Sequence, residues 1–207
     1  MKKIYLILIV TFFITSCDNN VMLSDNNIVP SDNEVSDKKI STQDSIEISN
    51  VVHGFYNWYS KEINEKHSKG FKPEIIKTAE GMSTLFLDNY LNNLRKNGFS
   101  QVLIEKEKES YQPCISELNK IKFKDLDTLD LYQIKKIKCD FGNNYRWGGG
   151  QEGIDGIKIH SCQKKIDTAI VVGEFYNQYG EEYHFWGRNQ EIVLIQVDST
   201  WKILNFK

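Results

Sequence analysis

This sequence of 207 residues has almost no excess of positive over negative charge, or of negative over positive. Its 26 Lys and Arg residues nearly balance 28 Asp and Glu residues, which gives a formal net charge of -2. Charges of both signs are spread through the C-terminal part of the chain. Because binding to nucleic-acid phosphates needs a concentrated basic face, the sequence predicts no nucleic-acid partner.

Several motifs of known chemistry are also missing. The sequence contains neither Gly-x-Ser-x-Gly nor HExxH, and its glycine-rich run at 143–156 lacks the lysine and the hydroxyl of a P-loop. His160-x-Cys162 together with Cys139 matches no zinc-ligand spacing. The aspartates at 125–130 lack the glycine and the terminal glutamate of an EF-hand calcium loop. We therefore expect no metal and no cofactor.

Apolar runs are short, and the most informative one lies near the N-terminus. Two lysines precede an apolar run from Ile4 to Ile14, which only Thr11 interrupts. Such a run has the length of a signal-peptide core and is too short to span a bilayer comfortably. The residues that follow, Ile14-Thr15-Ser16-Cys17, resemble the lipobox of bacterial lipoproteins.

This resemblance implies a signal peptide at 1–16, which is removed before Cys17. It further implies a diacylglycerol on the Cys17 thiol and usually a third acyl chain on the new amine. Two or three acyl chains hold a protein stably on a membrane. We therefore expect a protein of the bacterial cell envelope with a lipid anchor, in an inner or an outer membrane. An ordinary secretory signal with a coincidental cysteine is the alternative.

The segment 17–44 is polar after its first residue, and Asn, Asp and Ser dominate it. Such a stretch buries too little apolar surface to offset the entropy of ordering it. We expect Cys17 followed by a flexible tether here, and a single domain from 45 to 207.

Cysteine is scarce, with four residues in the chain. If Cys17 carries lipid, Cys114, Cys139 and Cys162 remain, and three cysteines allow one disulfide in an oxidising compartment. Cys139 and Cys162 fall in strands that we expect to be neighbours, which favours a bond between these two. Three buried thiols are the alternative.

Helical patterns dominate the first half of the expected domain. Apolar residues recur at spacings of three and four over residues 45–67, which predicts a long amphipathic helix. Pro73 suits the first position of a short helix over 73–77. Ser83 is a suitable N-cap and Gly98 a suitable C-terminal residue for a further helix over 83–98.

Strand patterns follow after Pro113. The last two expected strands form a hairpin around residues 198–200. Helices followed by antiparallel strands indicate the α+β class. The expected strands are 133–139, 157–162, 168–176, 182–197 and 201–206.

Three segments carry a family resemblance: an aromatic-rich helix (VVHGFYNWYSKEIN), a second helix (TLFLDNYLNNL) and the terminal strands (EIVLIQVDSTWKILNF). They resemble the cystatin-like, nuclear-transport-factor-like fold, and in particular a group of bacterial envelope lipoproteins whose domain has no assigned function. The resemblance covers residues 45–207. It implies N-terminal helices packed on a curved antiparallel sheet, which together form a cone with an open mouth. Some members of this fold are enzymes and many only bind ligands or partners.

Polar and aromatic residues gather toward one end of two expected strands. Strict alternation places His184, Trp186 and Arg188 on one face of the longest strand. Glu174 and Tyr176 share a face of the preceding strand. If both faces point into the cone, they form a pocket for an anionic or carbohydrate-like ligand, or for proton transfer. Alternatively, both strand ends project into solvent.

The run at 143–156 (NNYRWGGGQEGIDG) predicts a loop. Arg146 and Trp147 belong to the residue types that dominate binding hot spots. Partner binding through these two side chains is one interpretation. A long hairpin connection with its tryptophan packed onto the domain is the other.

These observations favour a binding or scaffolding module of the envelope over an enzyme. Its partner would be an envelope protein or a small ligand, in addition to the membrane that holds the anchor. The alternative is a cone-pocket enzyme, such as a lyase, an isomerase or a hydrolase, that uses His184 with Glu174. A purely structural envelope component is a third interpretation.

Overall fold

The computed structural model places residues 36–207 in one compact unit. The predicted leader and the predicted tether up to residue 39, including Cys17, lie outside the described residues, whereas residues 42–44 of the predicted tether belong to the first helix. Within the described ranges, no helix is long and apolar enough to cross a membrane. The structure describes residues 40–65, 70–137, 139, 146–148 and 153–207.

The first element is the long helix α1 (Thr42–Asn64), which confirms the helix predicted over 45–67. The Ser41 hydroxyl accepts a hydrogen bond from the Asp44 backbone N–H at 3.0 Å and caps the first turn. A hydrogen bond from Lys164 of the sheet, and then one from Ser41, hold the pKa of the Asp44 carboxyl below its usual value. The buried face of α1 comprises Ile48, Val52, Phe55, Tyr56, Tyr59 and Ser60.

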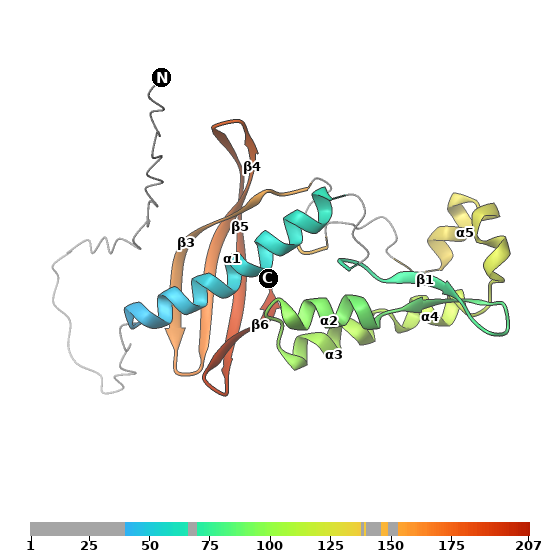
Figure 1. Cartoon of the computed structure of the whole chain (residues 1–207), viewed down its shortest axis with the longest axis horizontal. Helices are drawn as coiled ribbons and strands as arrows, with labels where there is room; N and C mark the ends of the chain where they lie inside the picture. Colours follow the sequence, from blue (N-terminus) through green and yellow to red (C-terminus); the bar gives the residue numbers. More distant parts are fainter. Residues whose placement is uncertain (1–39, 66–69, 138, 140–145, 149–152) are drawn as a thin grey trace, which may run out of the picture. The chain divides into compact units, whose positions relative to one another are not determined.

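The second layer is an antiparallel sheet in the order β3-β4-β5-β6 (Figure 1). Its strands are β3 (Gly156–Lys165), β4 (Thr168–Tyr179), β5 (Glu182–Val197) and β6 (Thr200–Phe206). The structure thus confirms four of the five predicted strands and the α+β class.

The turn between β5 and β6 shows why the closing hairpin was predictable. Val197 pairs with Thr200, so Asp198 and Ser199 form a two-residue turn. Both turn residues have positive φ, of 48° and 61°. This is the backbone of a type I′ turn, whose twist matches that of the flanking strands.

The segment before the second helix differs from the prediction. Residues predicted as a short helix form β1 (Glu74–Lys77), which pairs antiparallel with β2 (Ser83–Phe86). The β-branched residues at 75 and 76 favour a strand. Gly81 has a φ of 84°, which suits the tight connection between the two strands. Ser83 therefore pairs in a sheet and caps no helix, and α2 (Asp88–Lys96) begins five residues later.

Helices occupy the stretch that separates α2 from the main sheet. They are α3 (Gln101–Ser110), α4 (Gln112–Leu118), a 3-10 helix (Phe123–Thr128) and α5 (Leu131–Lys136). The strand predicted over 133–139 was therefore wrong. Ile137 and Cys139 from this stretch contribute to a small second core with α4 and β2.

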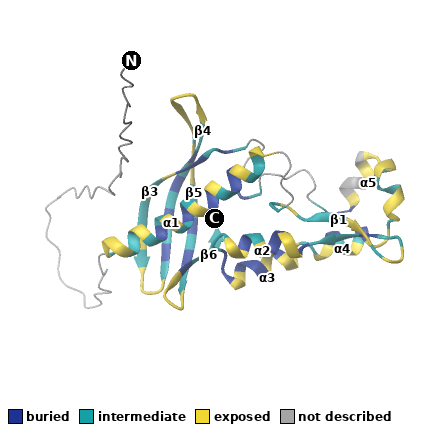
Figure 2. Cartoon of the chain, in the orientation of Figure 1, coloured by how far each residue is buried: buried dark blue, intermediate teal, exposed yellow. Residues whose placement is uncertain are grey.

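Helix α1 and the sheet enclose the main core, and buried residues line the surfaces that face each other (Figure 2). Tyr56 of α1 meets Phe175 of β4 with ring centroids 5.0 Å apart. Packed rings therefore cover the face of the sheet toward α1, where the resemblance implied an open cone. The rings are Phe55, Tyr56, Tyr59, Phe99, Trp147, Phe175 and Phe206.

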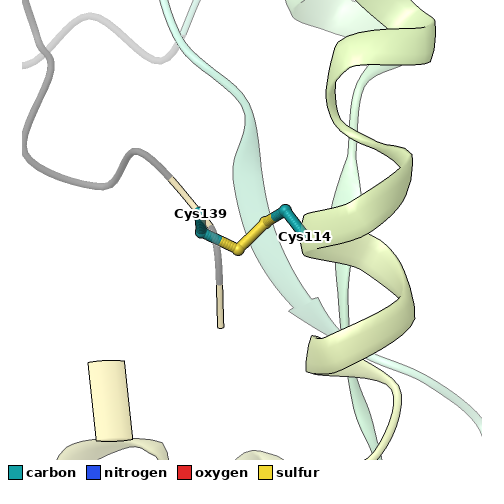
Figure 3. The surroundings of a disulfide bond; sticks show 2 residues. All are labelled: Cys114 and Cys139. Carbon is teal, nitrogen blue, oxygen red and sulfur yellow. A yellow bond between two sulfur atoms is a disulfide. The ribbon is translucent and has the colours of Figure 1, made fainter. Parts of the chain in front are cut away.

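The disulfide differs from the predicted one. Cys114 of α4 is bonded to Cys139, and their Cα atoms lie 4.7 Å apart (Figure 3). The predicted bond between Cys139 and Cys162 was wrong because Cys139 follows α5 and is not in a strand beside β3, where Cys162 lies. Closing a loop of 25 residues stabilises a fold by about 3 kcal/mol.

Candidate functional site

The register between β4 and β5 shows which predicted site residues share a face. Glu174 pairs with Asn189 and Tyr176 pairs with Phe185, so β5 has two more residues than β4 between these pairs. Gly187 lies inside the bulge with a φ of 68°. The two extra residues preserve the predicted alternation on either side of the bulge, since His184 and Gln190 pair with Asn177 and Gly173, which lie on one face of β4.

The predicted pair of His184 and Glu174 is not brought together. His184 pairs with Asn177, on the face of β4 that turns toward α1, whereas Glu174 belongs to the opposite face. The His184 side chain is 60% exposed, with its Nε2 atom 3.6 Å from the Glu182 carboxylate. Glu174 lies beside His160 instead, at 3.4 Å. No proton transfer between the predicted partners can follow from this geometry.

Trp186 and Tyr176 also lie on opposite faces of the sheet. Trp186 packs edge-on against Phe175 at 5.8 Å, and its indole N–H donates to the Asn177 side-chain oxygen at 2.6 Å. It thus extends the core side of the sheet. Tyr176 lies on the outer face, where it contacts Phe185. These two predicted residues do not line a common pocket.

Arg146 is held by a buried carboxylate that sequence reasoning missed. Its Nη2 and Nε atoms donate to the same Glu107 oxygen at 2.6 and 3.0 Å. The Tyr90 hydroxyl donates to the other oxygen at 2.6 Å. The Glu107 side chain is 2% exposed, against 33% for Arg146. Burial, and then the charge of Glu107, raise the pKa of Tyr90 well above its usual value.

Trp147 belongs to the core and is not an exposed hot spot. Its ring centroid lies 5.0 Å from those of Phe99 and Phe206. Its carbonyl accepts a hydrogen bond from the Tyr56 hydroxyl at 3.1 Å, and its backbone N–H donates to the Tyr59 hydroxyl at 3.2 Å. The structure therefore agrees with the interpretation in which this tryptophan packs onto the domain.

Three of the predicted residues do meet, in a cleft of about 490 Å³ beside the middle of β5 and the C-terminal end of β6. Arg146, Trp147 and Arg188 all line it. The sequence pattern missed the other contributors, because the β5 bulge and the packing of the 146–148 segment bring them together. The complete lining is Arg146, Trp147, Arg188, Asn189, Gln190, Phe206 and Lys207.

The charged side chains that line this cleft, which we call the basic cleft, are all cationic. Arg146, Arg188 and Lys207 are cationic, and no carboxylate lies among the described residues that line it. Behind the lining, Glu107 pairs with Arg146 and Glu191 pairs with Lys207 at 2.7 Å. A partly apolar cleft lined by three cationic side chains suits a ligand with an anionic group.

Among the described residues, no group of three or more His, Cys, Asp or Glu side chains is placed to hold a metal ion. Comparison with protein-family models, with curated proteins and with solved structures finds no match for this chain.

Proposed function

We propose that this protein is a lipid-anchored binding module of the bacterial cell envelope, and that its basic cleft receives an acidic group of a partner protein. The observation that carries this proposal is the convergence of three cationic side chains on one cleft. Trp147 and Phe206 add aromatic surface to the same cleft. Arginine and aromatic residues together are the types that anchor protein interfaces.

Two features support the envelope location. The sequence Ile14-Thr15-Ser16-Cys17 follows an apolar run of signal-peptide length. The disulfide between Cys114 and Cys139 suits an oxidising compartment outside the cytoplasm. The packing of α1 on an antiparallel sheet also supports assignment to the cystatin-like, nuclear-transport-factor-like fold, which we include in the proposal.

The alternative enzyme has less support. It depended on His184 and Glu174 acting on one substrate, and these residues lie on opposite faces of the sheet. Packed aromatic rings cover the face on which an internal pocket was expected.

The lipid anchor can be tested by metabolic labelling with an alkyne analogue of palmitate. We expect labelled wild-type protein in the membrane fraction and no label on Cys17→Ser, because the thiol is the acylated group. Cys162→Ser is the matched control, and it should keep the label. Label that persists on Cys17→Ser would show that the lipid, if any, is attached elsewhere.

The cleft can be tested by charge reversal at Arg188, which is exposed and lies outside the buried contacts of Arg146. Residues 36–207 contain both cores and the disulfide, so they can be produced alone as bait for envelope extract. We expect Arg188→Glu to retain about tenfold less of the captured partner, which corresponds to about 1.4 kcal/mol.

Lys165→Glu makes the same charge change at an exposed position on the edge strand β3 and should retain as much partner as wild type. Capture through the cleft should also weaken as salt is raised, since exposed charges are screened. Equal retention by both variants, or no specific partner, would contradict the proposal.

A further inference from the structure

A second surface lies on the outer face of the sheet, away from α1. The strand register brings Lys158 beside Glu174 and Tyr176 beside Phe185 on this face. Two further residues complete it, one from β3 and one from β5. We call this set the outer aromatic surface: Lys158, His160, Glu174, Tyr176, Tyr183 and Phe185.

The rings of this surface are exposed and yet ordered. Tyr183 is 53% exposed and Phe185 is 43% exposed. Tyr176 meets both edge-on, with ring centroids 5.1 and 5.9 Å away. A Cβ atom at Gly156 would lie 2.5 Å from the Tyr176 hydroxyl oxygen, so this ring rests against the backbone of β3. Rings fixed in this way lose little conformational entropy when a ligand binds.

Polar groups are fixed beside the rings. One Glu174 oxygen accepts a hydrogen bond from the Gly187 backbone N–H at 2.5 Å, so the β5 bulge orients this carboxylate. The other oxygen lies 3.4 Å from His160 Nε2. The Lys158 ammonium lies 5.2 Å from the centroid of the Phe185 ring. Donors and acceptors therefore border the aromatic rings on rigid strands.

The charge of this surface is balanced. Lys158 and Glu174 contribute one charge of each sign, so a strongly acidic or basic ligand meets no complementary net charge. An apolar ligand would desolvate these polar groups without replacing their hydrogen bonds to water, which is costly. The best match is a neutral molecule that carries both apolar faces and many hydroxyls.

We propose that the outer aromatic surface binds a neutral carbohydrate chain. A sugar ring has apolar C–H faces that pack on aromatic rings, and hydroxyls at its edge that can bond to Glu174, His160 and Lys158. Neither the basic cleft nor the proposed acidic partner takes part in this binding. The proposal is therefore independent of the proposed function, and either can fail alone.

The test titrates residues 36–207 with three neutral tetrasaccharides, namely cellotetraose, maltotetraose and chitotetraose, and follows backbone amide shifts by NMR. We expect at least one of them to bind with a Kd below about 10 mM and to shift the amides of β3, β4 and β5. The double variant Tyr183→Ala/Phe185→Ala should bind at least about tenfold more weakly, because it removes the exposed rings.

The same hairpin offers a matched control. Tyr179 is 65% exposed, but it lies on the other face, where its ring contacts His184. Tyr179→Ala should bind the tetrasaccharide as wild type does. Glu174→Gln keeps the size of the side chain and should weaken binding about threefold or more, since it removes a charged hydrogen-bond acceptor. Arg188→Glu should leave this affinity unchanged.

Three results would overturn the proposal. The first is the absence of binding by all three tetrasaccharides at about 10 mM. The second is equal affinity of the double variant and wild type, and the third is an equal loss in Tyr179→Ala. Capture of an envelope protein that the double variant loses, with no tetrasaccharide bound, would make this surface a protein interface and would also overturn the proposal.

Discussion

Replacing Arg146 with alanine is expected to lower the free energy of unfolding by about 3 kcal/mol. The variant leaves the Glu107 carboxylate, which is 2% exposed, buried without a cation. Breaking a buried ion pair in this way costs about 3–5 kcal/mol, and we expect the lower end because solvent reaches one third of the arginine. Urea unfolding of residues 36–207, followed by circular dichroism, measures the loss.

An exposed pair provides the control for this experiment. Lys120 and Glu117 are joined at 2.7 Å, nearly the distance of the Arg146–Glu107 pair, but their side chains are 66% and 36% exposed. Lys120→Ala should cost less than about 1 kcal/mol. Adding Glu107→Gln to Arg146→Ala should recover part of the loss, because a neutral amide is easier to bury than a charge. Equal costs for Arg146→Ala and Lys120→Ala would show that the pair is not effectively buried.

This ion pair also determines how the basic cleft must be studied. It fixes segment 146–148 to α3, and the cleft is built partly on that segment. A variant that removes Arg146 and Trp147 together would lose stability and binding at once, and its result would have no single meaning. Arg188 is exposed and can be changed without breaking the buried pair.

The elements with a sustained pattern were predictable from the sequence. Helix α1 repeats its apolar spacing over about four turns, from Ile48 to Ile63, and Ser41 caps it. Strands β3 to β6 follow one another through tight hairpins, so their pairing is local. The turn at Asp198 and Ser199 is of this kind. The α+β class follows from these elements alone.

The short elements were not predictable, because tertiary contacts decide them. Strand β1 has four residues and forms only by pairing with β2. The apolar residues around 133–139 suit a strand or a helix equally, and in the structure Ile137 and Cys139 pack into the second core directly after the helix α5. Since Cys139 follows that helix, the wrong element also led to the wrong disulfide partner.

The candidate site was only partly predictable, because tertiary contacts bring its residues together. Residue type singled out Arg146 and Trp147, alternation along β5 singled out Arg188, and the structure gathers these three in one cleft. Glu174 and Tyr176 were misplaced because the strand register pairs them with Asn189 and Phe185, on the face of the sheet opposite to His184 and Trp186. Glu107 was missed because it lies in a charged run (EKEKES) that is typical of an exposed helix face. Its burial depends on an arginine 39 residues away.

Replacing Trp147 with alanine is expected to lower the free energy of unfolding by about 3–5 kcal/mol, the usual cost of truncating a large aromatic side chain in a core. The side chain is 9% exposed and packs against the rings of Phe99, Phe206 and Phe55. These rings cannot close over the space that an indole leaves. Urea unfolding measures the loss, and near-ultraviolet circular dichroism should show a weakened aromatic signal.

Trp186 is the control for that variant. It is only half-buried; its ring packs against that of Phe175, and its indole N–H donates to the Asn177 side chain. Trp186→Ala should therefore cost about 1–2 kcal/mol, clearly less than Trp147→Ala. If Trp147→Ala instead cost less than about 1 kcal/mol, the indole would lie outside the core. The interpretation of Arg146 and Trp147 as an exposed hot spot would then regain its support, and the basic cleft would lose one of its walls.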